Sequence, residues 1–181
     1  MILLNKIDPS LRFIYCLTIY MFQLATTRFN AETWTENQHY RGKINHAGCI
    51  YGTPKQITNA VTLHQTLLVL EMQNEANKIM GIGLIRNAIV LGKHHNIYSD
   101  RFYNRYAYKG KYRIDRIDLD EEELKVITLL DTLVFKGYQH LKRGQGITIV
   151  PSWITDSKHI NFIAHFRTMF RTRFGETPES S

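Results

Sequence analysis

Two apolar segments separated by a short polar turn constrain the fold of this chain more than any other feature. Residues 66–73, TLLVLEMQ, and residues 78–91, KIMGIGLIRNAIVL, are apolar runs of strand length. The segment between them, NEAN, is typical of a turn. The sequence therefore predicts a buried strand over residues 66–73 and, over residues 78–91, a second strand or a bent pair of strands. Gly81 and Gly83 share one face of the second, because side chains alternate along a strand, and their missing side chains indicate a bend or the close approach of another backbone.

The clearest helix is expected within DLDEEELKVITLLDTLVFKG, residues 118–137. Asp118 or Asp120 can cap its start, and three glutamates occupy the first turn, where the helix dipole favours negative charge. Gly137 is a typical helix terminator. The apolar stripe of this helix is expected to consist of Leu124, Ile127, Leu130 and Val134.

Two further helices are predicted. GTPKQITNAV, residues 52–61, has the signature of a helix start. Thr53 can act as the cap, a proline follows it, and a glutamine three residues after the cap completes a capping box. The last helix is expected to begin at Asp156 or Ser157. A short strand, GITIVP, precedes it.

The N-terminal segment 11–25, LRFIYCLTIYMFQLA, is rich in strand-forming residues. A buried strand is the favoured interpretation. The core of a signal sequence, with Leu24 and Ala25 near a cleavage site, and a buried helix remain alternatives. Its apolar run is shorter than the roughly 20 residues that a membrane-spanning helix needs, so no membrane span is expected.

The chain has 181 residues, which suits one well-packed domain. No linker or repeat divides it, so we expect one globular domain over residues 1–174 and a flexible tail over 175–181. The predicted strands mostly follow one another too closely for successive β-α-β crossovers. The predicted fold class is therefore α+β, with a curved, mainly antiparallel sheet and about three helices.

The basic charge of the chain is unevenly distributed. The formal net charge is +7 and the isoelectric point is near 9.4. Residues 86–116 carry many lysines and arginines against only two aspartates, and within them RFYNRYAYKGKYRIDR, residues 101–116, interleaves basic and aromatic side chains. Segregated positive charge favours a polyanionic partner. The same pattern is also that of a sheet with a solvated basic face.

Residues 108–111, YKGK, are expected to form a hairpin turn around Gly110. Alternation along its arms places the basic side chains on the outer face and about half of the aromatic ones in the core. A second basic segment, residues 135–146, ends in two glycines that would let a phosphate approach the backbone. The candidate nucleic-acid-binding residues are Arg101, Arg105, Lys109, Lys111, Arg113, His140, Lys142 and Arg143.

No motif indicates a cofactor or a catalytic constellation. MGIGLI lacks the third glycine of a dinucleotide fingerprint, and KRGQG lacks the lysine of a P-loop. His39, His46 and Cys49 are the only group near enough in sequence to suggest a metal, without a regular ligand spacing. Cys49 with His46 or His140 is a conceivable nucleophile and base, although a buried inert thiol is the commoner fate. We therefore predict neither a metal nor a cofactor, and the catalytic residues are unknown.

The order of elements over residues 30–150 resembles the PUA-like β-barrels, the superfamily that includes EVE, ASCH and YTH domains. The segment TWTENQHYRG is followed by TPKQITNAV, then by LLVLEMQ, and then by KIMGIGLI, which is similar to the glycine-bearing strand of EVE-type domains. The resemblance implies a small closed sheet whose basic groove binds RNA or DNA. It also implies an aromatic pocket for a base, for which Trp34, Tyr51 and Trp153 are the candidates.

Three functions remain open. The first is a module that binds RNA or DNA through the basic and aromatic surface. The second is a structural protein whose surface packs against partner proteins in an assembly. The third is an enzyme that processes nucleic acid, for which no catalytic spacing is present. The abundance of Asn, Ile, Tyr and Lys is similar to that of proteins from large DNA viruses, so an intracellular place in a host cell, or in a virus particle, is expected.

Overall fold

The fold is built around a mixed five-stranded sheet. The computed structural model describes residues 22–92 and 94–175. In this sheet the strand order is β6–β4–β3–β1–β7, and among the described residues β1 and β3 form its only parallel pair. The strands are β1 (Phe22–Phe29), β3 (Thr66–Gln73), β4 (Lys78–Arg86), β6 (Tyr112–Asp115) and β7 (Thr148–Ile149). Over the part of the chain that the structure describes, the sheet is open and does not close into the barrel that the resemblance to PUA-like domains implied.

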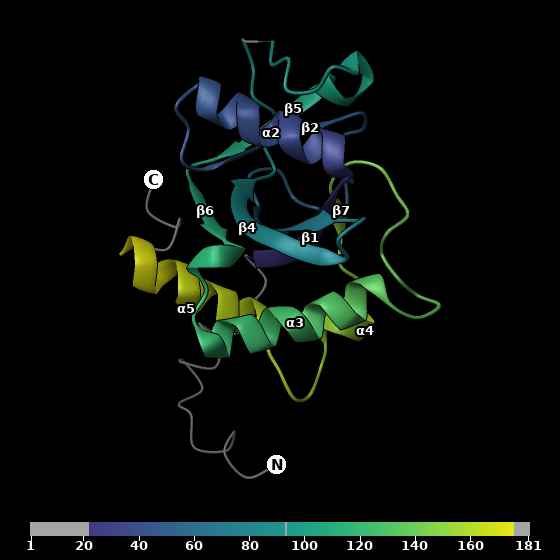
Figure 1. Cartoon of the computed structure of the whole chain (residues 1–181), viewed down its shortest axis with the longest axis vertical. Coiled ribbons are helices and arrows are strands. Elements are labelled where there is room, and N and C mark those ends of the chain that lie inside the picture. The colour runs from purple at the N-terminus through teal and green to yellow at the C-terminus, as the bar shows by residue number, and fades with distance from the viewer. Residues whose placement is uncertain (1–21, 93, 176–181) are drawn as a thin grey trace.

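A small antiparallel sheet and the helices form the outer layers (Figure 1). The small sheet pairs β2 (Cys49–Thr53) with β5 (Tyr106–Gly110). The helices are α2 (Ala31–Lys43), α3 (Glu121–Phe135), α4 (Ser152–Thr155) and α5 (Phe162–Phe174), with two 3₁₀ helices, η2 (Arg101–Asn104) and η3 (Arg116–Asp118). Helices α3, α4 and α5 lie on one side of the central sheet. Helix α2 and the small sheet lie on the other.

The central sheet is buried on both faces. Along β3, Leu68 and Leu70 pack with the apolar residues of α3 and α5, whereas Leu67 and Val69 pack with those of the small sheet. Every residue of β3 is buried. This explains why its sequence is a continuous apolar run and does not alternate with polar residues.

The predicted α+β fold class is confirmed, and β3 coincides with the predicted strand 66–73. Strand β4 ends at Arg86, earlier than the predicted 91. Four α-helices occur within the described ranges: α3 and α5 correspond to two of the three predicted helices, and α2 and α4 were not predicted. The predicted N-terminal strand is confirmed for residues 22–25, and its earlier part lies outside the described residues, as do residues 176–181 of the predicted tail.

Helix α3 begins where its sequence indicates. Asp120 accepts a hydrogen bond from the backbone of Glu123, whose side chain accepts one from the backbone of Asp120 in return. After its end, Gly137 adopts a φ of +78°. Three of the four predicted stripe residues are buried, but Leu124 is 39% exposed and lies outside the core.

The prediction of a helix at residues 52–61 is wrong. Thr53 is the last residue of β2, and its hydroxyl donates to the carbonyl of Lys55 instead of capping a helix. The backbone nitrogen of Ile57 then donates to the Tyr108 hydroxyl at 3.0 Å. Pairing with β5 and this tertiary contact therefore override the local helix signal. The last helix also begins later than predicted, at Phe162, with Asn161 as its cap.

The predicted hairpin around Gly110 is also wrong. Strands β5 and β6 pair with different partners, β2 and β4 respectively. Gly110 serves a close crossing instead, because a Cβ on it would lie 1.8 Å from the carbonyl oxygen of Leu84 in β4. Upstream, residues 101–104 form the helix η2 and not an alternating strand, so Phe102 is 50% exposed where it was expected in the core.

No helix within residues 22–92 and 94–175 combines the length and the apolar character that crossing a membrane requires.

Candidate functional site

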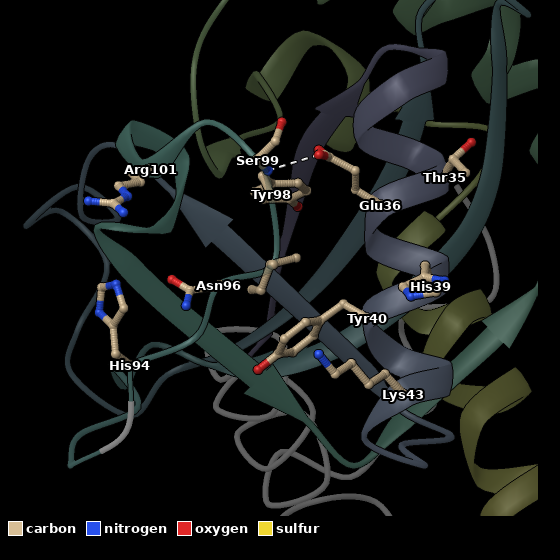
Figure 2. A pocket seen from close by; sticks show the side chains of 11 residues that line it. Thr35, Glu36, His39, Tyr40, Lys43, His94, Asn96, Tyr98, Ser99 and Arg101 are labelled. Atoms are coloured by element: carbon tan, nitrogen blue, oxygen red, sulfur yellow. Dashed lines mark hydrogen bonds between the residues drawn. The ribbon is translucent and has the colours of Figure 1, made fainter.

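A cleft of about 820 Å³ separates α2 from the segment 94–101 (Figure 2). We call it the α2 cleft. From the helix, Tyr40 and Lys43 reach toward the facing segment, which contributes His94 and Arg101. Its lining consists of Thr35, Glu36, His39, Tyr40, Lys43, His94, Asn96, Ile97, Tyr98, Ser99 and Arg101.

Helix α2 is fixed against the small sheet by a buried amide. Asn37 is 1% exposed and donates from Nδ2 to the carbonyl of Ile50 at 2.7 Å and to the Tyr98 hydroxyl at 3.3 Å. Its Oδ1 accepts from Nε of Arg41 at 3.2 Å. Because a buried amide must satisfy its hydrogen bonds, Asn37 sets the rotation of the helix. That rotation turns Tyr40 and Lys43 toward the cleft.

The opposite wall of the cleft is fixed by Asn104. Its Oδ1 accepts from the backbone nitrogens of Ile97 and Tyr98, both at 3.0 Å, and its Nδ2 donates to the Tyr98 carbonyl at 2.6 Å. The backbone nitrogen of Ser99 donates to Oε1 of Glu36 at 2.8 Å, which joins this wall to α2. These polar contacts therefore fix the positions of both walls of the cleft.

Positive charge predominates in the cleft. Lys43 and Arg101 are exposed, and the one carboxylate in the lining, Glu36, already accepts a backbone hydrogen bond. The Tyr40 hydroxyl shares a 2.8 Å hydrogen bond with Nδ1 of the buried His95. Burial raises the pKa of Tyr40 above its ordinary value, so its phenol stays neutral at physiological pH. The cleft thus presents cations and an oriented neutral phenol.

A smaller pocket of about 220 Å³, which we call the β1 pocket, lies at the end of β1. It shares Tyr98 with the α2 cleft, so the two hollows adjoin. The rings of Tyr98 and Tyr103 meet edge to face with centroids 6.3 Å apart. The lining residues are Thr27, Arg28, Phe29, Asn30, Thr33, Gly52, Asn74, Tyr98, Tyr103 and Gly144.

The predicted basic residues do not converge on one groove. Arg101 lines the α2 cleft, whereas Arg105 lines a separate hollow next to Tyr106. Lys109 and Lys111 line a third one. In the second basic segment, Nζ of Lys142 donates to Oδ1 of Asn77 at 2.9 Å in the turn between β3 and β4. Arg143 is exposed and His140 is half-buried, and neither lines the α2 cleft.

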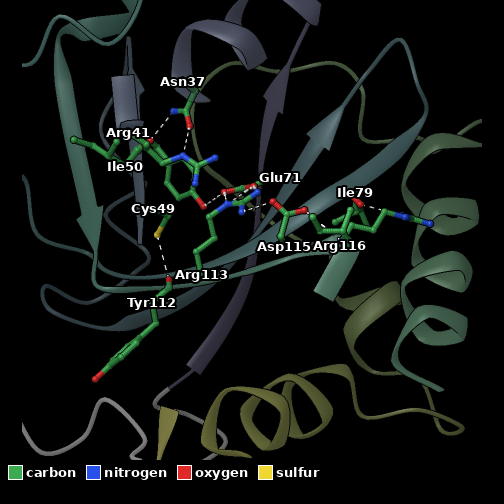
Figure 3. A network of polar contacts seen from close by, with 12 residues as sticks. Asn37, Arg41, Cys49, Ile50, Glu71, Ile79, Tyr112, Arg113, Asp115 and Arg116 are labelled. Carbon is green, nitrogen blue, oxygen red and sulfur yellow. Dashed lines mark hydrogen bonds and ion pairs between the residues drawn. The ribbon is translucent and has the colours of Figure 1, made fainter. Parts of the chain in front are cut away.

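Arg113 is not on the outer basic face where alternation placed it. Its side chain is 5% exposed and pairs with Glu71, which is 1% exposed (Figure 3). Nη2 donates to Oε2 of Glu71 at 2.7 Å, and Nη1 donates to Asp115 at 2.7 Å. Desolvation alone would lower the pKa of Arg113, but the charge and hydrogen bonds of Glu71 outweigh it and raise that pKa. This guanidinium is therefore part of the buried core, and its hydrogen bonds are made to Glu71 and Asp115.

The glycines of β4 make room for this buried network. A Cβ on Gly81 would lie 2.5 Å from Nη2 of Arg113, and one on Gly83 would lie 1.9 Å from the Tyr51 hydroxyl. The Tyr51 hydroxyl donates to Oε1 of Glu71 at 2.8 Å. What approaches this glycine face is a set of side chains and not the backbone that the sequence suggested as one possibility. The pairing of β3 with β4 is irregular beside Gly81, where the register shifts between Leu70 and Met72, which agrees with the bend that was the other possibility.

The three predicted cage aromatics are not assembled into one pocket. Tyr51 is fully buried in the polar network. Trp34 is half-buried, with the guanidinium carbon of Arg113 5.8 Å from its ring centroid. Trp153 is 44% exposed on α4, on the other side of the central sheet. None of the three lines the α2 cleft or the β1 pocket.

The predicted metal and nucleophile candidates do not form one site, although Nε2 of His46 lies 3.3 Å from the carbonyl oxygen of Cys49. Nε2 of His46 donates to the carbonyl of Gly110 at 3.0 Å, and the Cys49 thiol points into the core. Burial and the nearby Glu71 charge raise the pKa of Cys49 to about 12, so this thiol stays protonated and unreactive. His39 lies apart in the α2 cleft. Within the described ranges, no three His, Cys, Asp or Glu side chains are placed to hold a metal ion.

The residues of α2 that line the cleft were missed because α2 itself was missed. Its polar face gives only a weak apolar pattern, although its start carries a signal. Asn30 accepts from the backbone of Thr33 at 2.7 Å, and the Thr33 hydroxyl accepts from the backbone of Asn30. Asn, with Thr three residues later, is a variant of the capping box, and it could have located the helix.

The chain matches none of the family models, curated proteins or solved structures with which it was compared.

Proposed function

We propose that the protein binds single-stranded nucleic acid along the α2 cleft. The observation that carries the proposal is that Lys43 and Arg101, from two different elements, flank a cleft that also contains Tyr40 and adjoins a small aromatic pocket. Phosphates would lie against the two cations, and an unstacked base would enter the β1 pocket. Proteins that bind single strands combine these two features, a positive groove and aromatic surfaces.

A single strand suits these dimensions better than a duplex. The β1 pocket, at about 220 Å³, is below the usual size of a pocket for a drug-like molecule, and it suits one flat ring system. A base inside a duplex is stacked and paired, so it cannot enter such a pocket without being flipped out. The proposed resemblance to PUA-like domains also favours binding of RNA or DNA.

Fluorescence anisotropy with labelled 12-residue RNA and DNA strands tests this function. We expect binding at about 50 mM salt that weakens steeply as the salt concentration rises. The double variant Lys43→Gln, Arg101→Gln should weaken binding at least tenfold and lower the salt slope by up to about 1.4, the value for two lost phosphate contacts on a single strand.

The matched control is the double variant Lys109→Gln, Lys111→Gln. It removes the same charge from exposed positions that line another hollow, so it should change affinity much less. Equal losses in the two variants would mean that only net charge matters, and the α2 cleft would then not be the site. Absence of binding at low salt would refute the function itself.

An assembly protein is the second candidate function. Its specific support is the exposure of large apolar side chains that a solvated surface does not require, above all Ile117 at 87% and Leu91 at 85%. This candidate predicts self-association. Sedimentation velocity over a hundredfold range of protein concentration tests it, and a monomer at every concentration would argue against self-assembly.

A further inference from the structure

Glu36 is the one acidic side chain in the lining of the α2 cleft, which otherwise presents cations and neutral groups. Figure 2 shows its carboxylate directed from α2 toward Ser99 on the facing segment. Its Oε1 accepts from the backbone nitrogen of Ser99 at 2.8 Å. Its Oε2 makes no hydrogen bond within the described residues and is open to solvent. The cleft therefore contains an accessible acceptor that carries negative charge.

Neither cation of the cleft neutralises Glu36. Among the ion pairs of the described residues, none joins Glu36 to Lys43 or to Arg101. Lys43 lies about two turns of helix beyond Glu36 along α2. Arg101 begins η2, shortly after Ser99 on the other wall. A phosphate is attracted to these cations and repelled by the carboxylate. The phosphates of a bound strand would therefore lie beside Lys43 and Arg101, and another part of its backbone would lie beside Glu36.

The two walls of the cleft are in a fixed register. Glu36, Tyr40 and Lys43 follow one another at intervals of four and three residues, so they share one face of α2. On the other wall, Ser99 meets Glu36, and Nδ1 of His95 meets the Tyr40 hydroxyl at 2.8 Å. An acceptor, an aromatic ring and a cation therefore lie in this order along the cleft. A nucleotide carries a complementary group for each, namely a sugar hydroxyl, a base and a phosphate.

The chemistry of Glu36 specifies which group of a strand can lie beside it. A carboxylate oxygen only accepts hydrogen bonds, so its partner must be a donor. Within the sugar-phosphate backbone the only donor is the ribose 2′-OH, and DNA lacks it. The residues next to this carboxylate, Thr35 and Ser99, are exposed and uncharged, so they leave room for a sugar and do not compete as cations.

We propose that Glu36 is a specificity-determining residue, whose Oε2 accepts a hydrogen bond from a ribose 2′-OH, so that the α2 cleft selects RNA over DNA. With ribose, the carboxylate gains a hydrogen bond from the strand. With deoxyribose, it keeps only its repulsion of the neighbouring phosphates. This inference rests on the proposed function and names its ligand.

The test uses strands that contain uracil as their only base, because uracil has no exocyclic amine that could donate in place of the hydroxyl. Three labelled 12-residue strands, with ribose, deoxyribose or 2′-fluoro sugars, are titrated by fluorescence anisotropy. We expect the ribose strand to bind about tenfold more tightly than the other two, the lower end of the range for one hydrogen bond to a charged group. The 2′-fluoro sugar keeps a ribose-like conformation without the donor. A 2′-fluoro strand that bound as tightly as the ribose strand would therefore overturn the inference.

Glu36→Gln tests the residue itself. Glutamine keeps a carbonyl oxygen for the Ser99 backbone nitrogen, but an NH₂ group replaces the second oxygen and can only donate. The variant should bind the ribose strand more weakly and the deoxyribose strand equally or more tightly, so that the ratio of the two affinities falls toward one. A merely structural role of Glu36 would weaken both strands alike and leave the ratio unchanged, which would overturn the assignment.

Glu32→Gln is the matched control, because it removes the same charge from an exposed position in the first turn of α2, outside the cleft lining. It should leave the ratio of the two affinities unchanged. If this variant lowered the ratio as much as Glu36→Gln, the charge of the helix would be responsible, and the role of Oε2 would be refuted.

The Ser99 amide reports on the site directly, because it donates to the Glu36 carboxylate. In ¹⁵N-labelled protein, its signal should shift further with the ribose strand than with the deoxyribose strand. A signal that did not move with the ribose strand would place the discrimination elsewhere and overturn the inference. Ribose and deoxyribose strands that bound equally would overturn the selection of RNA and leave the α2 cleft as the binding site. Absence of binding by both strands at low salt would refute the proposed function itself.

Discussion

The buried pair of Glu71 and Arg113 gives the sharpest test of this fold. We consider Arg113→Met, which keeps the length of the side chain but removes the guanidinium. Glu71 would then remain almost fully buried and would lose the three guanidinium hydrogen-bond contacts that Arg113 makes with it, at 2.7 to 3.0 Å. Removing one partner of a buried ion pair costs about 3–5 kcal/mol, because the remaining charge is left without compensation.

This loss is a large fraction of the about 5–15 kcal/mol by which most domains are stable. With a urea m-value of about 2 kcal/mol/M, the midpoint of unfolding should fall by about 2 M. The assay is equilibrium unfolding in urea followed by tryptophan fluorescence and circular dichroism. Trp34 lies against this guanidinium, so its emission should report the change directly.

Two further variants make the reasoning refutable. The double variant Glu71→Leu, Arg113→Met removes both charges, so it should recover much of the lost stability. Lys109→Met, at an exposed position, should stay within about 0.5 kcal/mol of the original protein. If Arg113→Met lost less than about 1 kcal/mol, or if the double variant were less stable than the single one, the buried pair would not have the role that its geometry indicates.

Two more predictions concern stability. Gly83→Ala should clearly lower the midpoint temperature of unfolding, because the added Cβ would overlap the Tyr51 hydroxyl. Gly42→Ala in α2 should raise that temperature slightly, because nothing lies within 4 Å of the added Cβ. Equal effects of the two substitutions would contradict the packing described for β4. Hydrogen bonds from Arg173 hold the pKa of Glu123 below its usual range in the folded protein. The Glu123 carboxylate therefore stabilises the fold above about pH 4.3, which is the pKa of a glutamate in the unfolded chain. This stabilisation is lost as the pH falls through the lower pKa that Glu123 has in the folded protein. Glu123→Gln should therefore destabilise the protein at pH 7 and flatten the acid limb of its stability curve, as measured by urea unfolding from pH 7 to pH 3; an unchanged acid limb would contradict this.

The features that were correctly predicted are those that short segments of the sequence encode. The apolar run 66–73 needs no partner information to be recognised as a buried strand, and α3 carries both its cap and its terminator. Gly81 and Gly83 correctly indicated an irregularity of β4, although side chains and not another backbone pack against them. Of the candidate site residues, Arg101 lies in the proposed site.

The features that were missed depend on which strands meet. Alternation along residues 111–115 predicted that Arg113 lies on the outer face, which would be true of an isolated hairpin. In the protein β6 pairs with β4, and the face of β6 that carries Arg113 is covered by α2 and the small sheet. One signal was available. Glu71 lies inside an otherwise apolar strand, and a buried carboxylate requires a cation or a donor nearby. The identity of that cation could not be read from the sequence.

The sequence by itself determined the class of fold, the central strands and the excess of positive charge, because propensity, burial pattern and formal charge are properties of short segments. Only the tertiary structure decided which charges are available to a partner. Pairing of β6 with β4 drew Arg113 into the core, whereas the docking of α2 through Asn37 placed Lys43 on the same cleft as Arg101. Contacts between residues distant in sequence arise from long-range packing, which no local pattern encodes.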